Sequence, residues 1–422
     1  GPGPPDQPPV HPQRGPNALT AHDERPGDSI GPYKLLEVIG EGGFGTVWLA
    51  ERRSPMVQRV ALKIIKAGMD TRAVVARFEQ ERQALAVMDH PHVAKVFDAG
   101  ATPPAMGGRP YFVMEHVPGE PITTYADRQN LSVRQRLELF IPVCEAVQHA
   151  HHKGIIHRDL KPSNILVGVR DGEPTPKIID FGVAKAISHT LTDKTIFTET
   201  GQLIGTPEYM SPEQAEMGAT DIDTRTDVYS LGVVLYELLS GLLPFDSRSL
   251  RAAGYDAIRK VLRDQDAPKP STRLSTADDA TGAEIARHRV IEREQLAREL
   301  RRELDWIPLK ALRKDRTARY DTPADLAKDI RRYLDGQPLE AGPESAGYRV
   351  RKFVRRNKGP VIAVGTVLLA VVLGLGGTVW MAGVARTAEK EQRRLAESEA
   401  EARRTADAKT REAENALALS LI

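Results

Sequence analysis

The sequence has little of several features that mark large classes of protein. It holds a single cysteine, Cys144, among 422 residues, so an internal disulfide framework is excluded. Cys144 lies in an apolar pattern that predicts a buried core thiol. The 59 Lys and Arg nearly balance the 57 Asp and Glu, so we expect no nucleic-acid partner. No Cys/His spacing typical of zinc is present, and no secretory signal opens the chain. Specificity must therefore come from local sites.

The first part of the chain changes composition near residue 30. Residues 1–30 are rich in Pro and Gly without an apolar period, which predicts a disordered tail. Because the chain begins with Gly1 rather than Met, we expect a processed or excised segment. One helical run follows at about 73–88, among short β-rich runs that predict a small antiparallel sheet. These runs are 33–39, 46–51, 60–65, 93–99 and 111–115.

From about residue 118 the pattern becomes helical. Ser132 is the expected N-cap of a helix that runs to about Lys153. Residues 227–240 form an apolar run ended by Gly241, which predicts a central buried helix. A charge-rich stretch within 265–304 predicts an exposed helical insertion. We expect the globular part to end near residue 334.

Residues 361–385 predict a membrane span. These twenty-five residues carry no charge and cover roughly 37 Å as a helix, enough for a hydrocarbon core of ~30 Å. A buried core helix is the alternative. Basic residues are denser within 335–360 than beyond the span, which favours a cytoplasmic N-terminal side. Residues 386–422 lack Gly and Pro and predict a polar helical or coiled-coil stalk, whose apolar end suggests truncation.

The run His-Arg-Asp-Leu-Lys-Pro-Ser-Asn at 157–164 concentrates chemistry in eight residues. It places Asp159 to accept a hydroxyl proton, Lys161 to neutralise a phosphate and Asn164 to hold a metal ion. Asp180 follows sixteen residues after Asn164, within Asp-Phe-Gly, and supplies a second oxygen ligand. A base, a cation and two metal ligands at this spacing favour phosphoryl transfer.

Two further patterns fit a nucleotide. Residues 40–47 match G-x-G-x-x-G-x-V and lead into a strand, which favours a hairpin over phosphates rather than a dinucleotide fold. Lys63 lies in an apolar strand, where an unpaired ammonium is costly. Glu81 on the expected helix is its candidate partner, with Glu79 one helical step away.

Together these motifs resemble the eukaryotic-like (Hanks-type) Ser/Thr protein kinases of bacteria, of the single-pass membrane type, over about residues 33–334. The resemblance implies an α+β bilobal kinase fold, with an N-lobe at about 33–117 and a C-lobe at about 118–334. It also implies an ATP site with Met114 as gatekeeper and the following residues as the hinge. The implied ATP-binding residues are Ile39, Gly40, Glu41, Gly42, Gly43, Phe44, Gly45, Val47, Ala61, Lys63, Met114, Glu115 and Val117.

The resemblance also implies roles for single residues. Asp159 is the implied catalytic base, Lys161 supports the γ-phosphoryl group, and Lys63 pairs with Glu81. Asn164 and Asp180 are the implied ligands of Mg²⁺ or Mn²⁺. Asp227 resembles the buried anchor of the catalytic loop, and Glu213 is expected to pair with Arg319.

A regulatory role is expected for Arg158, which would bind a phosphate on the segment between Asp180 and Glu213. Thr198 and Thr200 lie nearest the end of that segment. The implied function is a membrane-anchored Ser/Thr kinase that phosphorylates proteins, including its own activation segment, with its kinase domain on the cytoplasmic side of a bacterial membrane. The span and stalk allow a homodimer. The alternative is a receptor-like pseudokinase scaffold.

Overall fold

The structure is a computed structural model that describes residues 24–42, 45–66, 88–181, 206–216, 223–247, 250 and 254–420. It divides into two units, Gly1–Pro343 and Glu344–Ile422. Most of the expected tail and helix 73–88 lie outside the described residues.

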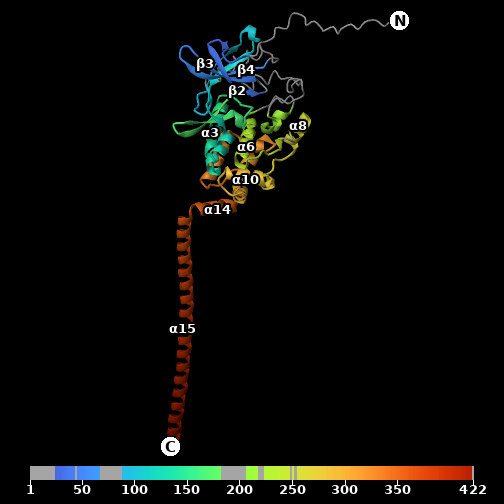
Figure 1. The fold of residues 1–422 in the computed structure, drawn as a ribbon. Helices are drawn as coiled ribbons and strands as arrows, with labels where there is room; N and C mark the ends of the chain where they lie inside the picture. The colour runs from blue at the N-terminus through green and yellow to red at the C-terminus, as the bar shows by residue number, and fades with distance from the viewer. Residues whose placement is uncertain are drawn as a thin grey trace, which may run out of the picture. The chain divides into compact units, whose positions relative to one another are not determined.

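A six-stranded antiparallel sheet forms one lobe of the first unit, in the order β1-β2-β3-β4-β6-β5 (Figure 1). All five strands expected from the β-rich runs are present, with ends shifted by up to three residues. A two-residue strand precedes them. The bounds are β1 Ser29–Ile30, β2 Tyr33–Gly42, β3 Gly45–Arg52, β4 Gln58–Ile65, β5 Val96–Ala101 and β6 Pro110–Glu115.

The central strand β4 is buried on both faces, and its alternation decides where Lys63 lies. Leu62 and Ile64 pack into a cluster confined to the sheet lobe. Ala61 and Ile65 point to the other face and join the large core shared with the helical lobe. Because side chains alternate along a strand, Lys63 lies on this second face, toward the helical lobe.

Helices build the second lobe around α6, Arg225–Ser240, which is buried along nearly its whole length. The expected helix from Ser132 is α3, Val133–His152, and Ser132 forms a capping box with Gln135. Gly241 ends α6 in the left-handed conformation, with φ +70°. The other helices of this core include α2 Ile122–Arg128, α12 Trp306–Ala311 and α13 Pro323–Leu334.

A small three-stranded sheet is formed by residues within the sequence of the second lobe, and the sequence patterns do not predict it. Its order is β7-β8-β9, with bounds Glu120–Pro121, Ile165–Arg170 and Glu173–Ile178. Strand β8 starts directly after Asn164, and β9 ends two residues before Asp180. The β8–β9 hairpin therefore brings the two expected metal ligands back toward each other.

The expectation of an exposed insertion at 265–304 is wrong, although the stretch is helical. Leu274, Leu296, Leu300 and Leu304 are each 0% exposed and belong to the main core. Short amphipathic helices carry these leucines on a narrow stripe that the many charges obscure in the sequence. The elements are α9 Pro270–Thr276, α10 Asp279–Arg287, α11 Arg293–Glu299 and a π-helical turn at Leu300–Leu304, after α8 Tyr255–Asp264.

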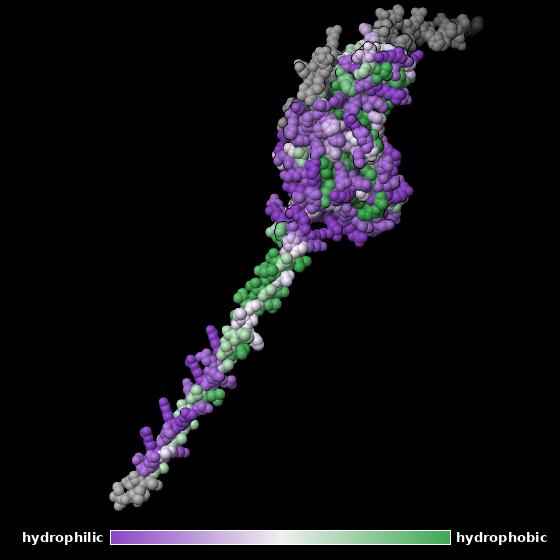
Figure 2. Space-filling view, turned by 90° about the vertical axis from the view of Figure 1, so that its left-hand side faces the viewer, coloured by the Kyte–Doolittle hydropathy of each residue, from purple (hydrophilic) through white to green (hydrophobic). Residues whose placement is uncertain are grey.

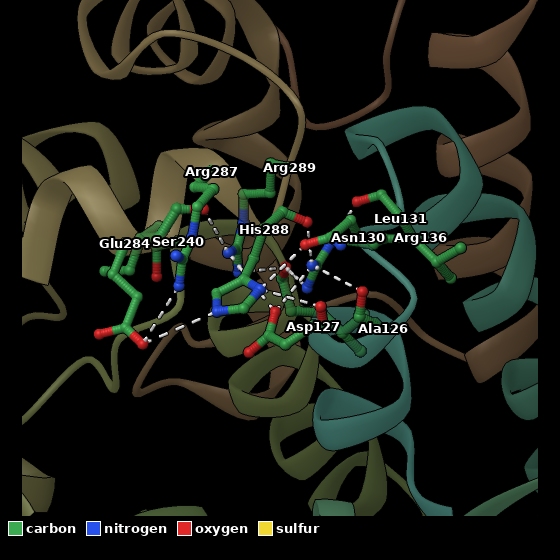
Figure 3. A network of polar contacts seen from close by, with 12 residues as sticks. Ala126, Asp127, Asn130, Leu131, Arg136, Ser240, Glu284, Arg287, His288 and Arg289 are labelled. Atoms are coloured by element: carbon green, nitrogen blue, oxygen red, sulfur yellow. Dashed lines mark hydrogen bonds and ion pairs between the residues drawn. The ribbon is translucent and has the colours of Figure 1, made fainter.

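Two buried arginines attach this segment to the rest of the lobe (Figure 3). Arg289 is 2% exposed and donates hydrogen bonds to the carbonyls of Leu239 (2.7 Å) and Leu238 (2.9 Å) at the end of α6. Arg136 of α3 donates to the carbonyl of His288 (2.8 Å), and its guanidinium lies 2.7 Å from the carboxylate of Asp127. Burial lowers the pKa of Arg289 to about 9, so it stays charged at neutral pH beside the negative end of the α6 dipole.

The compact unit continues past residue 334, where the sequence placed its end. The backbone N–H groups of Glu340 and Ala341 donate to the buried carboxylate of Asp329, at 2.6 and 2.9 Å. Leu339 is buried in the main core. The boundary therefore lies at Pro343.

The second unit consists of α14, Ala346–Arg356, and the long helix α15, Lys358–Ser420. The expected span at 361–385 lies within α15, and residues 386–420 continue the same helix. Figure 2 shows a hydrophobic band on the first part of α15, followed by a mostly hydrophilic surface. The described part of the chain contains one helix that is long and apolar enough, by length and composition, to cross a membrane.

Candidate active site

Asp227 of α6 anchors the loop at residues 157–164 through hydrogen bonds. Its carboxylate accepts hydrogen bonds from the backbone N–H groups of His157 and Arg158, each at 2.8 Å, and contacts His151 Nε2 at 2.8 Å. Burial pushes the pKa of Asp227 up, but the bonds from His151 and the backbone outweigh it and leave the pKa below its ordinary value. Arg158 has φ +67°. The expected anchor is confirmed, and it holds a left-handed backbone at the centre of the loop.

The structure brings Asp159, Lys161 and Asn164 together, as the spacing predicts. Lys161 Nζ lies 2.9 Å from Asp159 Oδ2. Asn164 Nδ2 donates to the Asp159 carbonyl at 2.7 Å and to its carboxylate at 3.1 Å. These bonds orient the Asp159 carboxylate and use the amide nitrogen of Asn164, so the amide oxygen is the atom that the predicted metal site would use. Lys161 also donates to Thr206 Oγ1 at 3.3 Å, so Thr206 lies beside this cluster.

Lys63 makes an ion pair that joins the two lobes. Its Nζ lies 2.7 Å from Oδ2 of Asp180, and Lys63 is only 9% exposed. Glu81, the expected partner, lies outside the described residues, so that pairing stays a prediction. Sequence reasoning missed the partner Asp180, although the need of a buried ammonium for a carboxylate pointed to one.

The Asp-Phe-Gly segment is fixed to the catalytic loop by contacts of its neighbours. The rings of His157 and Phe181 stack edge to face with centroids 4.6 Å apart. His157 Nε2 lies 3.0 Å from the carbonyl of Ile179. Asp180 itself has φ +65°. The buried His157 therefore contacts the residues on both sides of Asp180.

The expected adenine residues lie on neighbouring strands of the six-stranded sheet. Ala61 pairs with Met114 across β4 and β6, and both side chains are buried. Val47 of β3 packs against the same core. The Glu115 side chain pairs with Lys177 Nζ of β9 at 2.5 and 2.7 Å. Only backbone groups of Glu115 are therefore left for a base, and the hinge role of Glu115 and Val117 stays a prediction.

The glycine loop is formed by the ends of β2 and β3. Gly40 pairs with Val47, and a Cβ on Gly45 would lie 2.0 Å from the carbonyl oxygen of Ile64. Glycine at position 45 is thus required by the close approach of β3 to β4. Gly43 and Phe44, at the tip, lie outside the described residues. The phosphate-binding role of Ile39, Gly40, Glu41 and Gly42 stays a prediction with them.

The donor set fits a magnesium ion that completes its coordination with phosphates. Asn164 and Asp180 supply hard amide and carboxylate oxygens. Within the described ranges, no group of three or more His, Cys, Asp or Glu side chains forms a metal site on its own. Mg²⁺ in kinase-type sites uses one or two protein carboxylates together with nucleotide phosphates and water. The Asp180 carboxylate, with the Asn164 amide oxygen beside it in the donor set, fits such a site.

Comparison with known proteins decides the family. Residues 33–320 match the protein kinase domain. The chain belongs to the protein kinase family. It is 35% identical over 311 residues to "Serine/threonine-protein kinase PknB" of Mycobacterium leprae, covering 73% of this chain and 44% of that protein. It is 38% identical over 245 residues to "Serine/threonine-protein kinase Pkn1" of Myxococcus xanthus, covering 58% of this chain and 34% of that one. The chain thus spans less than half of these relatives.

A solved structure shows the same fold. The kinase domain of Mycobacterium tuberculosis PknI (double mutant) aligns with a TM-score of 0.52 and 22% identity, covering 74% of this chain and 98% of that one. The resemblance to bacterial Hanks-type kinases is confirmed at the level of family, and so is the bilobal fold.

The structure contains the expected ion pair of Glu213 with Arg319. Arg319 donates to both oxygens of Glu213, at 2.7 and 2.8 Å, and Arg319 is buried. Thr226 donates to the same carboxylate at 2.9 Å. Burial raises the pKa of Glu213, but the bonds from Arg319 outweigh this effect and leave the pKa below its ordinary value.

Ser211 and Gln214 connect this region to the catalytic loop, a link that sequence reasoning missed. Ser211 forms a capping box with Gln214 at the start of α5, Pro212–Ala215. Gln214 Nε2 then donates to the carbonyl of Arg158 at 2.7 Å. The signal was the capping-box spacing of Ser211 and Gln214. The regulatory role of Arg158 stays a prediction, because Thr198 and Thr200 lie outside the described residues.

Proposed function

We propose that the chain is an active Ser/Thr protein kinase that transfers the γ-phosphoryl group of ATP to Ser or Thr hydroxyls of proteins. The observation that carries this proposal is the joined cluster of Asp159, Lys161 and Asn164, with Lys161 Nζ 2.9 Å from the Asp159 carboxylate. Phosphoryl transfer needs alignment and charge neutralisation more than covalent chemistry from the protein, and this cluster supplies both.

Each residue then has one task. Asp159 accepts the proton of the acceptor hydroxyl as its oxygen bonds to the γ-phosphorus, while the bond to the β-phosphate oxygen breaks and ADP leaves. Lys161 neutralises charge on the transferred group. Lys63, paired with Glu81, holds the α- and β-phosphates. Mg²⁺ or Mn²⁺ held by Asn164 and Asp180 would supply further neutralisation of the phosphates.

The nucleotide binds between the lobes in this proposal. Val47 and Ala61 enclose the adenine from the sheet lobe, and the backbone of Glu115 and Val117 provides its hydrogen bonds. The backbone of residues 39–45 covers the phosphates. The opposed placement of Ala61 and Met114 on neighbouring strands supports this arrangement.

The acceptors and the location belong to the same proposal. Lys161 in Leu-Lys-Pro-Ser-Asn resembles the loop of kinases that act on Ser and Thr. The acceptors include Thr198 and Thr200 of the chain's own activation segment, whose phosphates Arg158 binds. Residues 361–385 anchor the kinase in a bacterial membrane as a single pass with the catalytic domain in the cytoplasm, where ATP is available. Pairing of two chains through the span and stalk allows trans-phosphorylation.

Replacement of the base tests the proposal. Asp159→Asn should lower incorporation of radiolabelled phosphate from ATP by about 100- to 10,000-fold, because the general base is lost. The matched control is Asp171→Asn, which makes the same change at a residue exposed on the β8–β9 turn and should keep full activity. ATP binding, followed by thermal shift, should survive in both variants.

The same experiment distinguishes an active kinase from the alternative, a pseudokinase scaffold. A pseudokinase scaffold would bind partners without transfer, so wild type and Asp159→Asn would show equal, background labelling. Labelling of Asp159→Asn at the wild-type rate would instead contradict the assignment of the base. Lys63, Asp159, Asn164 and Asp180 are all present, which favours the active enzyme.

A further inference from the structure

Helix α14 has an unusual composition for a link between two parts of a chain. Its eleven residues read AGYRVRKFVRR and contain no acidic side chain. The helix has its own N-cap, because Ser345 Oγ accepts a hydrogen bond from the N–H of Tyr348 at 3.3 Å. It is therefore a defined helix rather than an extended linker. Its basic residues are Arg349, Arg351, Lys352, Arg355 and Arg356.

The apolar and basic side chains of α14 lie on opposite sides of the helix. At about 100° per residue, Ala346, Val350, Phe353 and Val354 fall within one arc of about 100°, and every Arg and Lys falls outside it. Val350, Phe353 and Val354 are 60%, 58% and 41% exposed. A grouped apolar face of this kind, left in water, marks an interaction surface.

Helix α14 also turns away from the axis of α15. The turn is at Asn357, with φ −114° and ψ +44°, where the N–H and Nδ2 of Asn357 both donate to the carbonyl of Phe353, at 2.9 and 3.0 Å. Within this second unit, α14 lies crosswise to the start of α15 (Figure 1). The apolar band of α15 begins four residues after Asn357. A helix crosswise to a membrane span lies along the membrane surface.

We propose that α14 binds the surface of an anionic phospholipid bilayer, with its apolar face at the boundary of headgroups and acyl chains and its basic side chains on lipid phosphates. The inference rests on the proposed membrane span at 361–385. Two features favour this partner. The basic side chains of α14 complement anionic lipid headgroups, and α14 is followed directly in the chain by the helix that contains the proposed span. Amphipathic helices with a basic polar face bind anionic interfaces, and each basic side chain near such a surface adds about a five-fold preference over a neutral one.

A single fluorescent label on the full-length chain tests the proposal. Cys144 is fully buried, so a thiol introduced on α14 is the accessible one. Val350→Cys, labelled with a polarity-sensitive dye, is placed in nanodiscs of phosphatidylcholine with or without phosphatidylglycerol. We expect a blue-shifted emission and strong quenching by headgroup-linked spin labels in the anionic discs, with markedly weaker effects in the neutral discs.

The matched control is a label on the other face. Arg355→Cys lies about 140° around the helix from position 350, so its label should be quenched less than the label at 350 in the same anionic discs. Replacing all five basic residues of α14 by Gln should return the label at 350 to its behaviour in neutral discs. Equal quenching at 350 in both lipid compositions would overturn the proposal. A blue shift at 350 without lipid quenching would indicate a protein contact instead and would also overturn it.

A third label distinguishes this inference from the anchor on which it rests. Val372→Cys lies in the apolar band of α15 and should be quenched by tail-linked spin labels in both lipid compositions. Loss of that signal would refute the membrane span. Quenching at 372 with no lipid-dependent change at 350 would refute only the role of α14.

Discussion

Asp227 is the residue on which the geometry of the catalytic loop depends. It is fully buried, yet its carboxylate is bonded to two backbone N–H groups and to His151. A buried charge is stable only when it is bonded in this way. The left-handed turn at Arg158 would otherwise be unfavourable. One carboxylate thus stabilises the fold and positions Asp159, which is two residues from His157.

Substitution at Asp227 is expected to affect both stability and activity. Asp227→Asn removes the charge that three donors share and should lower the free energy of unfolding by about 3 kcal/mol. Urea denaturation measures this change. Asp171→Asn, an exposed control, should stay within about 0.5 kcal/mol of wild type. An unchanged midpoint for Asp227→Asn would show that the anchor is dispensable.

The stabilisation by Asp227 is expected to depend on pH. The pKa of Asp227 is lowered in the folded chain from an ordinary value of 3.8. At pH values near this ordinary pKa, the folded state therefore binds fewer protons than the unfolded state. The contribution is therefore complete well above pH 3.8 and is lost as pH falls toward the folded pKa. The difference in unfolding free energy between wild type and Asp227→Asn should shrink from about pH 6 to about pH 3. A difference that stays constant would contradict this assignment.

At the scale of the element, α11 shows how a charge-rich helix belongs to a core. Its sequence REQLARE contains one leucine, Leu296, which is completely buried, whereas Arg298 is exposed. The next turn adds Leu300 and Leu304 on the same side. Composition counts every residue of such a helix equally, but packing depends only on the stripe that faces inward.

Truncation of a leucine in that stripe should destabilise the folded state. Leu296→Ala removes a buried side chain and should lower the free energy of unfolding by about 2–5 kcal/mol. Arg298→Ala, two positions away on the exposed side, should change it by less than about 0.5 kcal/mol. Thermal or urea unfolding of the two variants gives the comparison. Equal, small effects would mean that the segment is not part of the cooperative core.

At the scale of the whole molecule, a kinase domain is followed in the chain by an apolar helical stretch and a polar helix. If the span anchors the kinase and two chains pair, then phosphorylation between chains should depend on their density in the membrane. The Asp159→Asn chain, which we expect to be unable to label itself, is the reporter of such transfer.

Mixed reconstitution tests this dependence. Active chain and Asp159→Asn chain placed in the same liposomes should give reporter labelling that rises with protein density. The two chains in separate liposomes should give little labelling, because collisions between vesicles are needed. Reporter labelling that is equal in the two arrangements would argue against pairing in the membrane. Activity of the wild-type chain toward added protein serves as the control.

Most of the elements that the sequence predicts correctly follow from local residue patterns. The five β-rich runs, the helix capped by Ser132 and the apolar helix after Asp227 all follow from periodicity and turn chemistry within a few residues. The catalytic motifs were visible for the same reason, since Asp159, Lys161 and Asn164 lie within one short loop. The β8–β9 hairpin was missed because its Pro174 and Pro176 weaken the strand signal.

By itself the sequence determined the family, through several short motifs taken together, and the apolar helical stretch, because each motif and the stretch consist of adjacent residues. Only the tertiary structure decided that Lys63 pairs with Asp180, that Gln214 bonds the carbonyl of Arg158, and that Arg289 is buried beneath a charged segment. These contacts join residues 50 to 117 positions apart. Which of two faces of a strand or helix meets a distant element depends on packing, and packing is a property of the whole chain.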